Sequence, residues 1–366
     1  MTFIPSAAGV VPFLLVILAA AALISLALTP SIRRVAVRLD AVDRPGHRRV
    51  NTSPVPRGGG IAVVAAFIVM SLVALVVNAV FNFVPIPTTV EPTDLIGLLL
   101  GGVLAAAFGV VDDYLDLRAR WQFLFQLALA GLAILFGITV DFIANPFGGG
   151  VLHFEGIVAG AFTVLWIAGM INAMNFIDGL DGLSSGIGII AALTLGIISL
   201  TTQVGPAGQP FLTVLCFVLA GSLLGFLRWN FHPASIFAGT SGVMFLGYTL
   251  AVLSILGTAK VAVAMLILGV PIIDAFWNIV RRLAQGRSPF TPDRGHLHHR
   301  LLDVGLSHRQ TVVLIYGICV GLGILAMLLS GATQLYAFMG VFFASGFVLF
   351  ILARGGFDLD DGDRED

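Results

Sequence analysis

An asparagine and two aspartates stand at three-residue intervals in the segment NAMNFIDGLDGLSSG, residues 172–186. On a helix, Asn175, Asp178 and Asp181 would fall along one stripe and face a single ligand, because residues three apart are neighbours on a helix surface. The glycines of the segment would let backbone amides approach a bulky anion or nucleotide. Helix capping is the alternative, but a cap needs only one such residue. The segment therefore predicts a polar ligand site.

A second acidic pair, Asp112 and Asp113, ends the apolar run before YLDL. Adjacent helical residues point about 100° apart, so at most one of the two can aim straight at a shared metal ion. Carboxylates beside phosphate groups favour Mg²⁺, a hard cation that takes oxygen ligands and shares them with substrate phosphates. Taken alone, the pair fits an ordinary interfacial helix end equally well.

A third polar cluster lies in PDRGHLHHR, residues 292–300. Clustered histidines suit zinc. The arginines among them oppose a dication and favour phosphate, which they bind through bidentate hydrogen bonds. We therefore predict an anion-binding cap, with an ordinary cytoplasmic loop as the alternative. The arginine- and glycine-rich stretch 40–63 is either a basic segment attracted to anionic lipid or part of a phosphate-binding floor.

The composition indicates which elements position these clusters. Of 366 residues, 58% are hydrophobic and 11% charged, and the mean hydropathy is +1.02. These values exclude an ordinary soluble globule and indicate an all-α polytopic membrane protein. The net charge of −1 provides no field for nucleic acid. We expect one integral membrane domain over residues 1–366, with both cysteines as small buried apolar residues.

Eleven apolar stretches are long enough to cross the hydrocarbon core of a bilayer. They lie near 8–29, 59–80, 95–111, 122–140, 156–175, 183–201, 211–227, 235–257, 260–280, 310–330 and 333–353. We expect about eleven transmembrane helices, or ten if two weaker stretches are re-entrant.

The arginines predict the orientation of the chain. With eleven alternating spans, all eighteen arginines fall on one face and the sole lysine, Lys260, on the other. By the positive-inside rule the arginine face is cytoplasmic, so the N-terminus lies outside and the C-terminus inside. The acidic segment 355–366 is expected to be a disordered cytoplasmic tail. Most carboxylates share the arginine face, which favours an interfacial enzyme or binder over a secondary transporter.

Five motifs carry a resemblance to a known family. They are DRPGHRRVNTSPVPRGGG, GVVDDYLDL followed by Gln126, NAMNFIDGLDGLSSG, GFLRWNFHPASIF and PDRGHLHHRLL, all on the predicted cytoplasmic face. Over roughly residues 30–310 the chain resembles the polyprenyl-phosphate N-acetylhexosamine-1-phosphate transferases. The PDRGHLHH segment is more similar to the N-acetylglucosamine-1-phosphate branch than to the related phospho-N-acetylmuramoyl-pentapeptide transferases.

The resemblance implies a reaction. A UDP-N-acetylhexosamine would give its sugar-1-phosphate to a polyprenyl phosphate and release UMP, as the first membrane step of a cell-envelope glycan. The reaction would take place at the cytoplasmic face of the bacterial inner (plasma) membrane. We favour direct attack by the lipid phosphate over a covalent aspartyl intermediate. The sequence leaves a homodimer open.

The resemblance also implies the roles of individual residues. Asp112, Asp113 and Asp178 would be catalytic, and Asp112, Asp178 and the residue at position 240 would hold Mg²⁺, or Mn²⁺ in its place. The substrate contacts would be Asn175, Asp181, Asn230, Asp293, Arg294, His296, His298, His299 and Arg300.

One position departs from the family pattern. After GFLRWNFHPASIF the family continues with Gly, Asp, Thr or Ser, and Gly, and its aspartate is a magnesium ligand. Here AGTSG places Thr240 there, and a hydroxyl is a neutral, weaker ligand. The substitution disables the protein, or marks a homologue that binds without turnover, or is offset by another carboxylate such as Asp274. As a milder departure, Gln122 replaces a usual lysine, with Arg120 close enough in sequence to compensate.

Overall fold

The computed structural model describes residues 7–44, 53–82, 84, 86, 90–145, 147, 148, 150–201, 209–257, 260–288 and 295–354. Asp293, Arg294 and the acidic segment 355–366 lie outside the described residues, so the predictions for them stay predictions.

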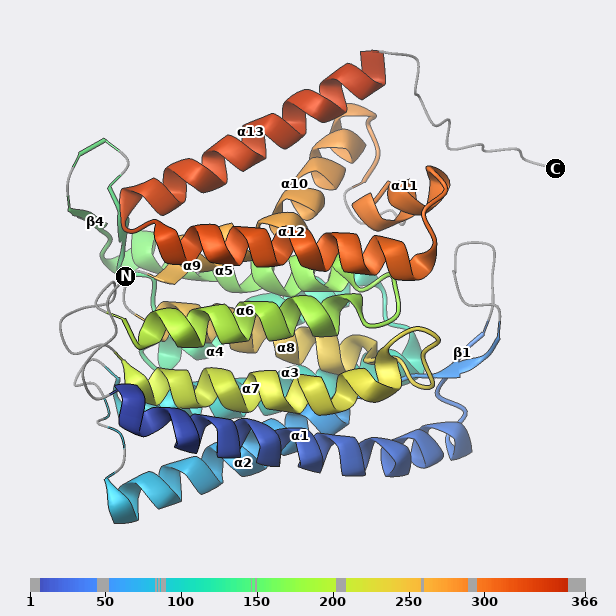
Figure 1. Cartoon of the computed structure of the whole chain (residues 1–366). Helices are drawn as coiled ribbons and strands as arrows, with labels where there is room; N and C mark the ends of the chain where they lie inside the picture. The colour runs from blue at the N-terminus through green and yellow to red at the C-terminus, as the bar shows by residue number, and fades with distance from the viewer. Residues whose placement is uncertain are drawn as a thin grey trace.

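The described residues form thirteen helices and two short antiparallel hairpins (Figure 1). The helices are α1 (Ala7–Arg38), α2 (Gly60–Phe81), α3 (Pro92–Leu115), α4 (Ala119–Leu135), α5 (Gly156–Ile177), α6 (Leu183–Ser199), α7 (Pro210–Asn230), α8 (Gly239–Leu256), α9 (Lys260–Ile267), α10 (Gly269–Ala284), α11 (Leu297–Asp303), α12 (His308–Leu328) and α13 (Ala332–Arg354). The hairpins pair β1 (Val42–Asp43) with β2 (Val55–Pro56), and β3 (Phe142–Ala144) with β4 (Val151–His153).

The helices agree with the all-α, multi-pass membrane protein expected. Among the described residues, seven helices are long and apolar enough to cross a membrane, and the α9–α10 pair raises the number to eight if it counts as one span. Three further apolar helices, within α4, α6 and α13, are shorter than the seven. The count of eleven spans, the single-domain organisation and the sides of the termini stay predictions.

The ninth expected span, 260–280, is not one straight helix. It is broken between α9 and α10, whose axes are bent by 79°. Pro271 lies in the first turn of α10, where it has no backbone N–H to donate to the preceding turn, and Gly269 beside it weakens helical continuity. The break turns α10 toward the segment that carries α11 (Figure 1).

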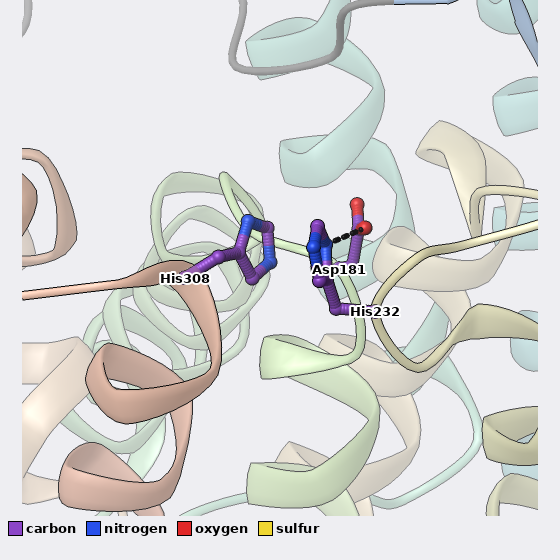
Figure 2. A group of neighbouring side chains, drawn as sticks. All are labelled: Asp181, His232 and His308. Atoms are coloured by element: carbon purple, nitrogen blue, oxygen red, sulfur yellow. Dashed lines mark hydrogen bonds and ion pairs between the residues drawn. The ribbon is translucent and has the colours of Figure 1, made fainter.

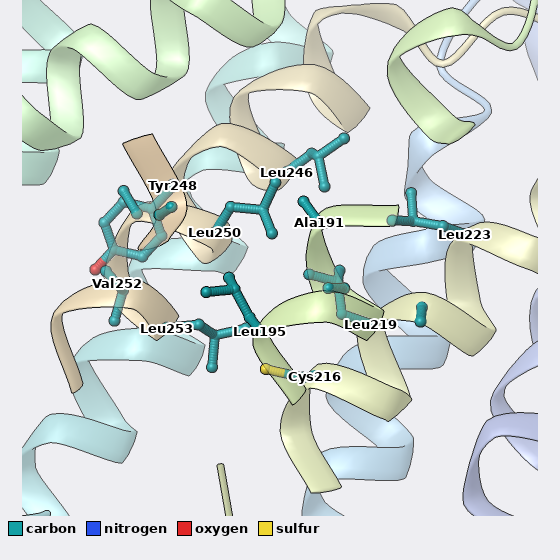
Figure 3. Packing of buried hydrophobic residues seen from close by; sticks show 14 of the residues in the cluster. Ala191, Leu195, Cys216, Leu219, Leu223, Leu246, Tyr248, Leu250, Val252 and Leu253 are labelled. Carbon is teal, nitrogen blue, oxygen red and sulfur yellow. The ribbon is translucent and has the colours of Figure 1, made fainter. Parts of the chain in front are cut away.

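Helices α7 and α8 form the centre of the bundle, with 83% of the apolar window of each buried. Leucines from α6, α7 and α8 interlock there, among them Leu195, Leu219 and Leu250 (Figure 3). The buried Tyr248 hydroxyl donates to the Gly97 carbonyl at 2.8 Å and so ties α8 to α3. The position of α8 is therefore fixed on several sides.

Helix α3 approaches the start of α8 without a side chain between them. A Cβ at Gly109 would lie 2.3 Å from the Ser241 Cα, closer than real Cβ contacts come. The β1–β2 hairpin braces the same region, since Gly59 N donates to Phe237 O at 2.9 Å and Phe237 N donates to Pro56 O at 2.8 Å. The last turn of α3 thus lies against the first turn of α8.

Candidate active site

The two adjacent aspartates of α3 meet the start of α8. Thr240 Oγ1 donates to Asp112 Oδ2 at 2.7 Å, and Thr240 N donates to Asp113 Oδ1 at 2.7 Å. Asp113 Oδ2 accepts from Ser241 N at 3.1 Å and from Ser241 Oγ at 2.9 Å. Asp113 therefore satisfies the first amides of α8, where a negative charge is favoured by the helix dipole. Both aspartates therefore bind the start of α8. Asp112 accepts from the Thr240 side chain, and Asp113 accepts from the Thr240 and Ser241 amides and from the Ser241 hydroxyl.

Asp112 is held by neutral donors. Its Oδ1 accepts from Gln122 Nε2 at 2.9 Å and from Leu117 N at 3.2 Å, and its side chain is buried. Gln122 thus occupies the place of the family's lysine with an uncharged amide. Arg120 is exposed, and its guanidinium lies over the Trp121 ring at 5.4 Å. None of the donors described here neutralises the Asp112 charge.

The expected helical stripe through residues 175, 178 and 181 is wrong. Helix α5 ends at Ile177, Asp178 is its C-cap, and α6 begins at Leu183. Gly182 precedes α6 with φ of 79°, a left-handed conformation that glycine adopts without strain and that ends helical continuity. The cap of α6 is Gly182, which has no side-chain capping bond, so neither Asp181 nor Ser184 caps it. Asn175 stays on α5, whereas Asp181 lies in the turn.

Asp178 lies in a region with excess negative charge. It accepts a hydrogen bond from the buried Ser184 hydroxyl. Burial raises its pKa to about 7, and the charges of Asp113 and Asp181 add to the rise. Hard oxygen donors with negative charge suit a divalent cation such as Mg²⁺. Asp112, Asp178 and Thr240 carry donors of this kind, and the magnesium site that they would form stays a prediction.

Asp181, His232 and His308, which come from three separate parts of the chain, lie side by side (Figure 2). Asp181 Oδ2 lies 2.7 Å from His232 Nδ1 and accepts from Ala234 N at 3.0 Å. The His308 ring stacks on His232, with centroids 4.0 Å apart and planes 22° apart. One ligand atom from each of Asp181, His232 and His308 lies within 4.8 Å of the others. Nearly parallel rings, however, direct their in-plane lone pairs side by side and not at one point, so we interpret the group as a braced stack.

The histidines of α11 lie against the turn after Asp178. His298 packs on Gly179 so closely that a Cβ there would lie 2.0 Å from His298 Nε2. His298 is 2% exposed, and no described group partners its Nδ1. Burial, with its neighbours His299 and His296, lowers the pKa of His298 to about 2. The predicted cap therefore contributes a neutral imidazole at this position.

Other predicted site residues brace the protein itself. Arg300 Nε donates to Gly295 O at 3.0 Å. Asn230 is buried; its Nδ2 donates to Ile236 O at 3.1 Å and its Oδ1 accepts from Ser185 at 3.0 Å. Both side chains thus already bond to other groups of the protein. Substrate contacts by them stay predictions.

Asp274 is also engaged. Its two oxygens bond His296 Nδ1 and Leu297 N, each at 2.7 Å. The hypothesis that it replaces the missing metal-binding carboxylate at position 240 is not supported by this arrangement, because the carboxylate is committed to the start of α11.

Sequence reasoning missed several residues around the aspartates. Ser184 and Ser241 stand inside the quoted motifs, and their closeness to acidic residues was the available signal. Arg57, in the first loop, pairs with Asp43 and lies near enough to act electrostatically on Asp113. The phosphate-floor and lipid-binding interpretations of this part of the loop both stay predictions.

A cavity of about 250 Å³ lies at the opposite end of the bundle. It is lined by residues of α8, α9 and the segment 137–144, together with Asp94. Asp94 Oδ2 accepts from Glu91 N at 2.8 Å as part of a capping box. None of the predicted site residues lines this cavity, which lies apart from the carboxylate-rich end.

Comparisons with known proteins point the same way. Residues 95–258 match the family described as Glycosyl transferase family 4. A relative from Bacillus subtilis, named a probable undecaprenyl-phosphate N-acetylglucosaminyl 1-phosphate transferase, is 36% identical over 334 residues, covering 89% of this chain and 86% of the relative. A decaprenyl-phosphate N-acetylglucosaminephosphotransferase from Mycobacterium tuberculosis is 34% identical over 322 residues, covering 81% and 77%.

A more distant relative extends the series. The undecaprenyl-phosphate alpha-N-acetylglucosaminyl 1-phosphate transferase of Escherichia coli is 28% identical over 305 residues, covering 77% of this chain and 75% of the relative.

An apolar helical bundle with a carboxylate-rich end defines a multi-pass membrane protein with a polar site at one end of its helices. The chain belongs to glycosyl transferase family 4, among the polyprenyl-phosphate N-acetylglucosamine-1-phosphate transferases.

Proposed function

We propose that this protein transfers N-acetylglucosamine-1-phosphate, or a similar N-acetylhexosamine-1-phosphate, from a UDP-sugar to a polyprenyl phosphate and releases UMP. The reaction is the first membrane step of a cell-envelope glycan, at the cytoplasmic face of the bacterial plasma membrane. Relatives whose names include this transfer to undecaprenyl or decaprenyl phosphate support the reaction class. The cytoplasmic face follows from the arginine distribution.

One observation carries the proposal. The ends of α3 and α5 and the start of α8 bring Asp112, Asp113, Thr240 and Asp178 into one acidic cluster, as their hydrogen bonds and mutual electrostatic effects indicate. The histidine segment packs on Gly179, directly after Asp178. Such a cluster, closed by a polar cap, suits a substrate that is itself a diphosphate.

The reaction joins two anions, so positioning and charge neutralisation supply most of the acceleration. A phosphate oxygen of the lipid attacks the phosphorus that carries the sugar, the bond from this phosphorus to UMP breaks, and UMP leaves. A phosphate monoester has a second pKa of about 6, so the lipid phosphate is largely ionised near neutral pH. Asp112 and Asp113 act near the attacking phosphate, and Asp178 and Asp181 orient the nucleotide sugar.

Mg²⁺ supplies neutralisation of the diphosphate and of the departing UMP when it is bound. Asp112, Asp178 and the Thr240 hydroxyl are the residues that would hold it, and Mn²⁺ would take the same oxygen donors. Burial is the main cause of the raised pKa of Asp178, and the charges of Asp113 and Asp181, which add to the rise, support a cation at this place.

A catalytically impaired homologue is the second candidate function, and Thr240 is the observation that favours it. The Thr240 hydroxyl donates its proton to Asp112 and brings no negative charge. A protein of this kind would still bind a UDP-sugar or a lipid phosphate at the same site without turning it over.

The deciding experiment is UMP release by the purified protein in detergent with Mg²⁺, a polyprenyl phosphate and UDP-N-acetylglucosamine. We expect turnover by the natural chain, its loss with EDTA, and a fall of at least about 100-fold in kcat for Asp112→Asn, a typical loss when charge stabilisation is removed.

Thr240→Asp separates the two candidates, with Thr240→Asn as the uncharged control of the same shape. Turnover only in Thr240→Asp establishes the impaired homologue. If neither variant nor the natural chain releases UMP, and the natural chain also fails to bind the UDP-sugar in calorimetry, the substrate assignment is rejected.

A further inference from the structure

Both oxygens of the Asp274 carboxylate bond to residues at the start of α11. It lies in α10, 9% exposed, and its Oδ2 is 2.7 Å from His296 Nδ1. Its Oδ1 accepts from Leu297 N at 2.7 Å. Leu297 is the first residue of α11, and His296 is the N-cap residue, which has no side-chain capping bond of its own. Asp274 thus satisfies an amide at the start of a helix from another element.

The partners of His296 define where its proton lies. An arginine only donates, and Arg282 approaches His296 Nε2 at 3.4 Å. An ionised Asp274 only accepts, so a neutral His296 carries its proton on Nδ1 and presents a lone pair at Nε2. Asn278 Nδ2 also lies 3.2 Å from Nδ1, but Asp274 O and Oδ1, at 2.8 and 3.1 Å, take its two hydrogens. The tautomer is assigned from these partners.

His296 and Arg282 also lie against the motif that carries Asp178. The His296 ring lies 5.4 Å from the Phe176 ring, and the Arg282 guanidinium lies 5.8 Å over the same ring. Two residues after His296, His298 packs on Gly179. Helix α11 has only seven residues, and a helix this short has little stability of its own. The anchor at its first residue therefore helps to fix its position, together with the packing of Leu301 and Leu302 on the core.

We propose that Asp274 is the positioning residue of the histidine segment. It holds His296 in the Nδ1–H tautomer and fixes the start of α11, so that His298 stays against Gly179. It touches no reacting atom. Only the kinetic consequence of this role rests on the proposed function, since the tautomer and the anchoring are properties of the folded chain.

The first measurement needs no turnover. Histidine-selective ¹⁵N NMR of the natural protein in detergent, with His296 assigned by its loss in His296→Gln, reports which ring nitrogen carries the proton. We expect a protonated Nδ1 and an unprotonated Nε2 at His296. A proton on Nε2 overturns the proposal, whether or not the protein is active as a transferase.

The second measurement is Asp274→Asn, which keeps the shape but cannot accept from both His296 Nδ1–H and Leu297 N through ionised oxygens. We expect kcat for UMP release to fall about 10- to 100-fold, the value of a charge-assisted hydrogen bond, while KM for the polyprenyl phosphate is unchanged. The matched control is Asp94→Asn, a buried capping carboxylate at the opposite end of the bundle, which should retain natural kcat.

The two failures are distinguishable. Natural kcat in a folded Asp274→Asn overturns the positioning role, as does an equal loss in Asp94→Asn. Absence of UMP release from the natural chain contradicts the proposed function and leaves the NMR result to decide the proposal. If Asp274→Asn does not fold, the tautomer in the natural protein still decides it.

Discussion

Asp178 shows how a residue's environment changes its chemistry. Its pKa is raised from 3.8 to about 7, mainly by burial, with Asp113 and Asp181 adding to the effect. Between these pH values the folded protein binds a proton that the unfolded chain does not bind. Stability therefore falls as pH rises through this window, because the folded state binds more protons than the unfolded state.

The pH dependence of unfolding tests this raised pKa of Asp178. In EDTA, we expect the melting temperature of the natural protein in detergent to fall between pH 4 and about 7. Asp178→Asn should flatten this fall and be stabilised most above pH 7. The control is Asp141→Asn, an exposed carboxylate at the other end of the bundle. Parallel curves for the natural protein and Asp178→Asn would contradict the assignment.

At the scale of elements, the contact between α3 and α8 is what brings the aspartates to Thr240. The two helices touch at Gly109, where a side chain would collide with the Ser241 backbone. Asp112 and Asp113 follow one turn later, which places their carboxylates at the first turn of α8. The geometry of the site therefore depends on a residue with no chemistry of its own.

Paired glycine substitutions separate this contact from helix propensity. Gly109→Ala should destabilise the protein by about 1–3 kcal/mol, as overpacking does, and should reduce UMP release by moving Thr240 away from Asp112. Gly131→Ala, on α4, adds a methyl group where nothing lies within 4 Å, and should stabilise by about 0.5–1 kcal/mol. Thermal unfolding of both variants measures the difference. Equal shifts of the same sign would show that close packing at Gly109 is unimportant.

At the scale of the whole molecule, polarity is divided between the two ends of the bundle. The β1–β2 hairpin and α11 lie at one end, with the acidic cluster, and the β3–β4 hairpin lies at the other (Figure 1). By the positive-inside rule we predict that the first end faces the cytoplasm. With the proposed function, this orientation would put the polyprenyl phosphate headgroup and the UDP-sugar on the same side of the membrane.

Single cysteines test this orientation in intact cells. Both native cysteines are buried, which leaves a low labelling background. Phe147 is 93% exposed in the β3–β4 turn, and Val304 is 78% exposed after α11. We expect a membrane-impermeant thiol reagent to label Phe147→Cys from outside, and Val304→Cys only after the cells are opened. The reverse pattern would invert the predicted topology.

The sequence predicted local features well. The apolar stretches coincide with helices, because an 18- to 24-residue apolar segment has few other ways to satisfy its backbone in a membrane. Asp112, Asp113 and Asp178 were recognisable because carboxylates are costly among apolar residues and indicate function when they occur there. The broken ninth span was missed, although Gly269 and Pro271 were readable, since composition alone does not give a bend angle.

Only the tertiary structure decided which atoms meet. Thr240 is 128 residues from Asp112, yet its hydroxyl donates to that carboxylate. Asp274 stood as a candidate metal ligand in the sequence, and the fold commits it to His296 and Leu297. Helix formation follows from the chemistry of neighbouring residues, whereas these pairings depend on how distant helices pack. The amino-acid sequence therefore determined the membrane class, the helices and the acidic motifs, and helix packing decided the partners of each side chain.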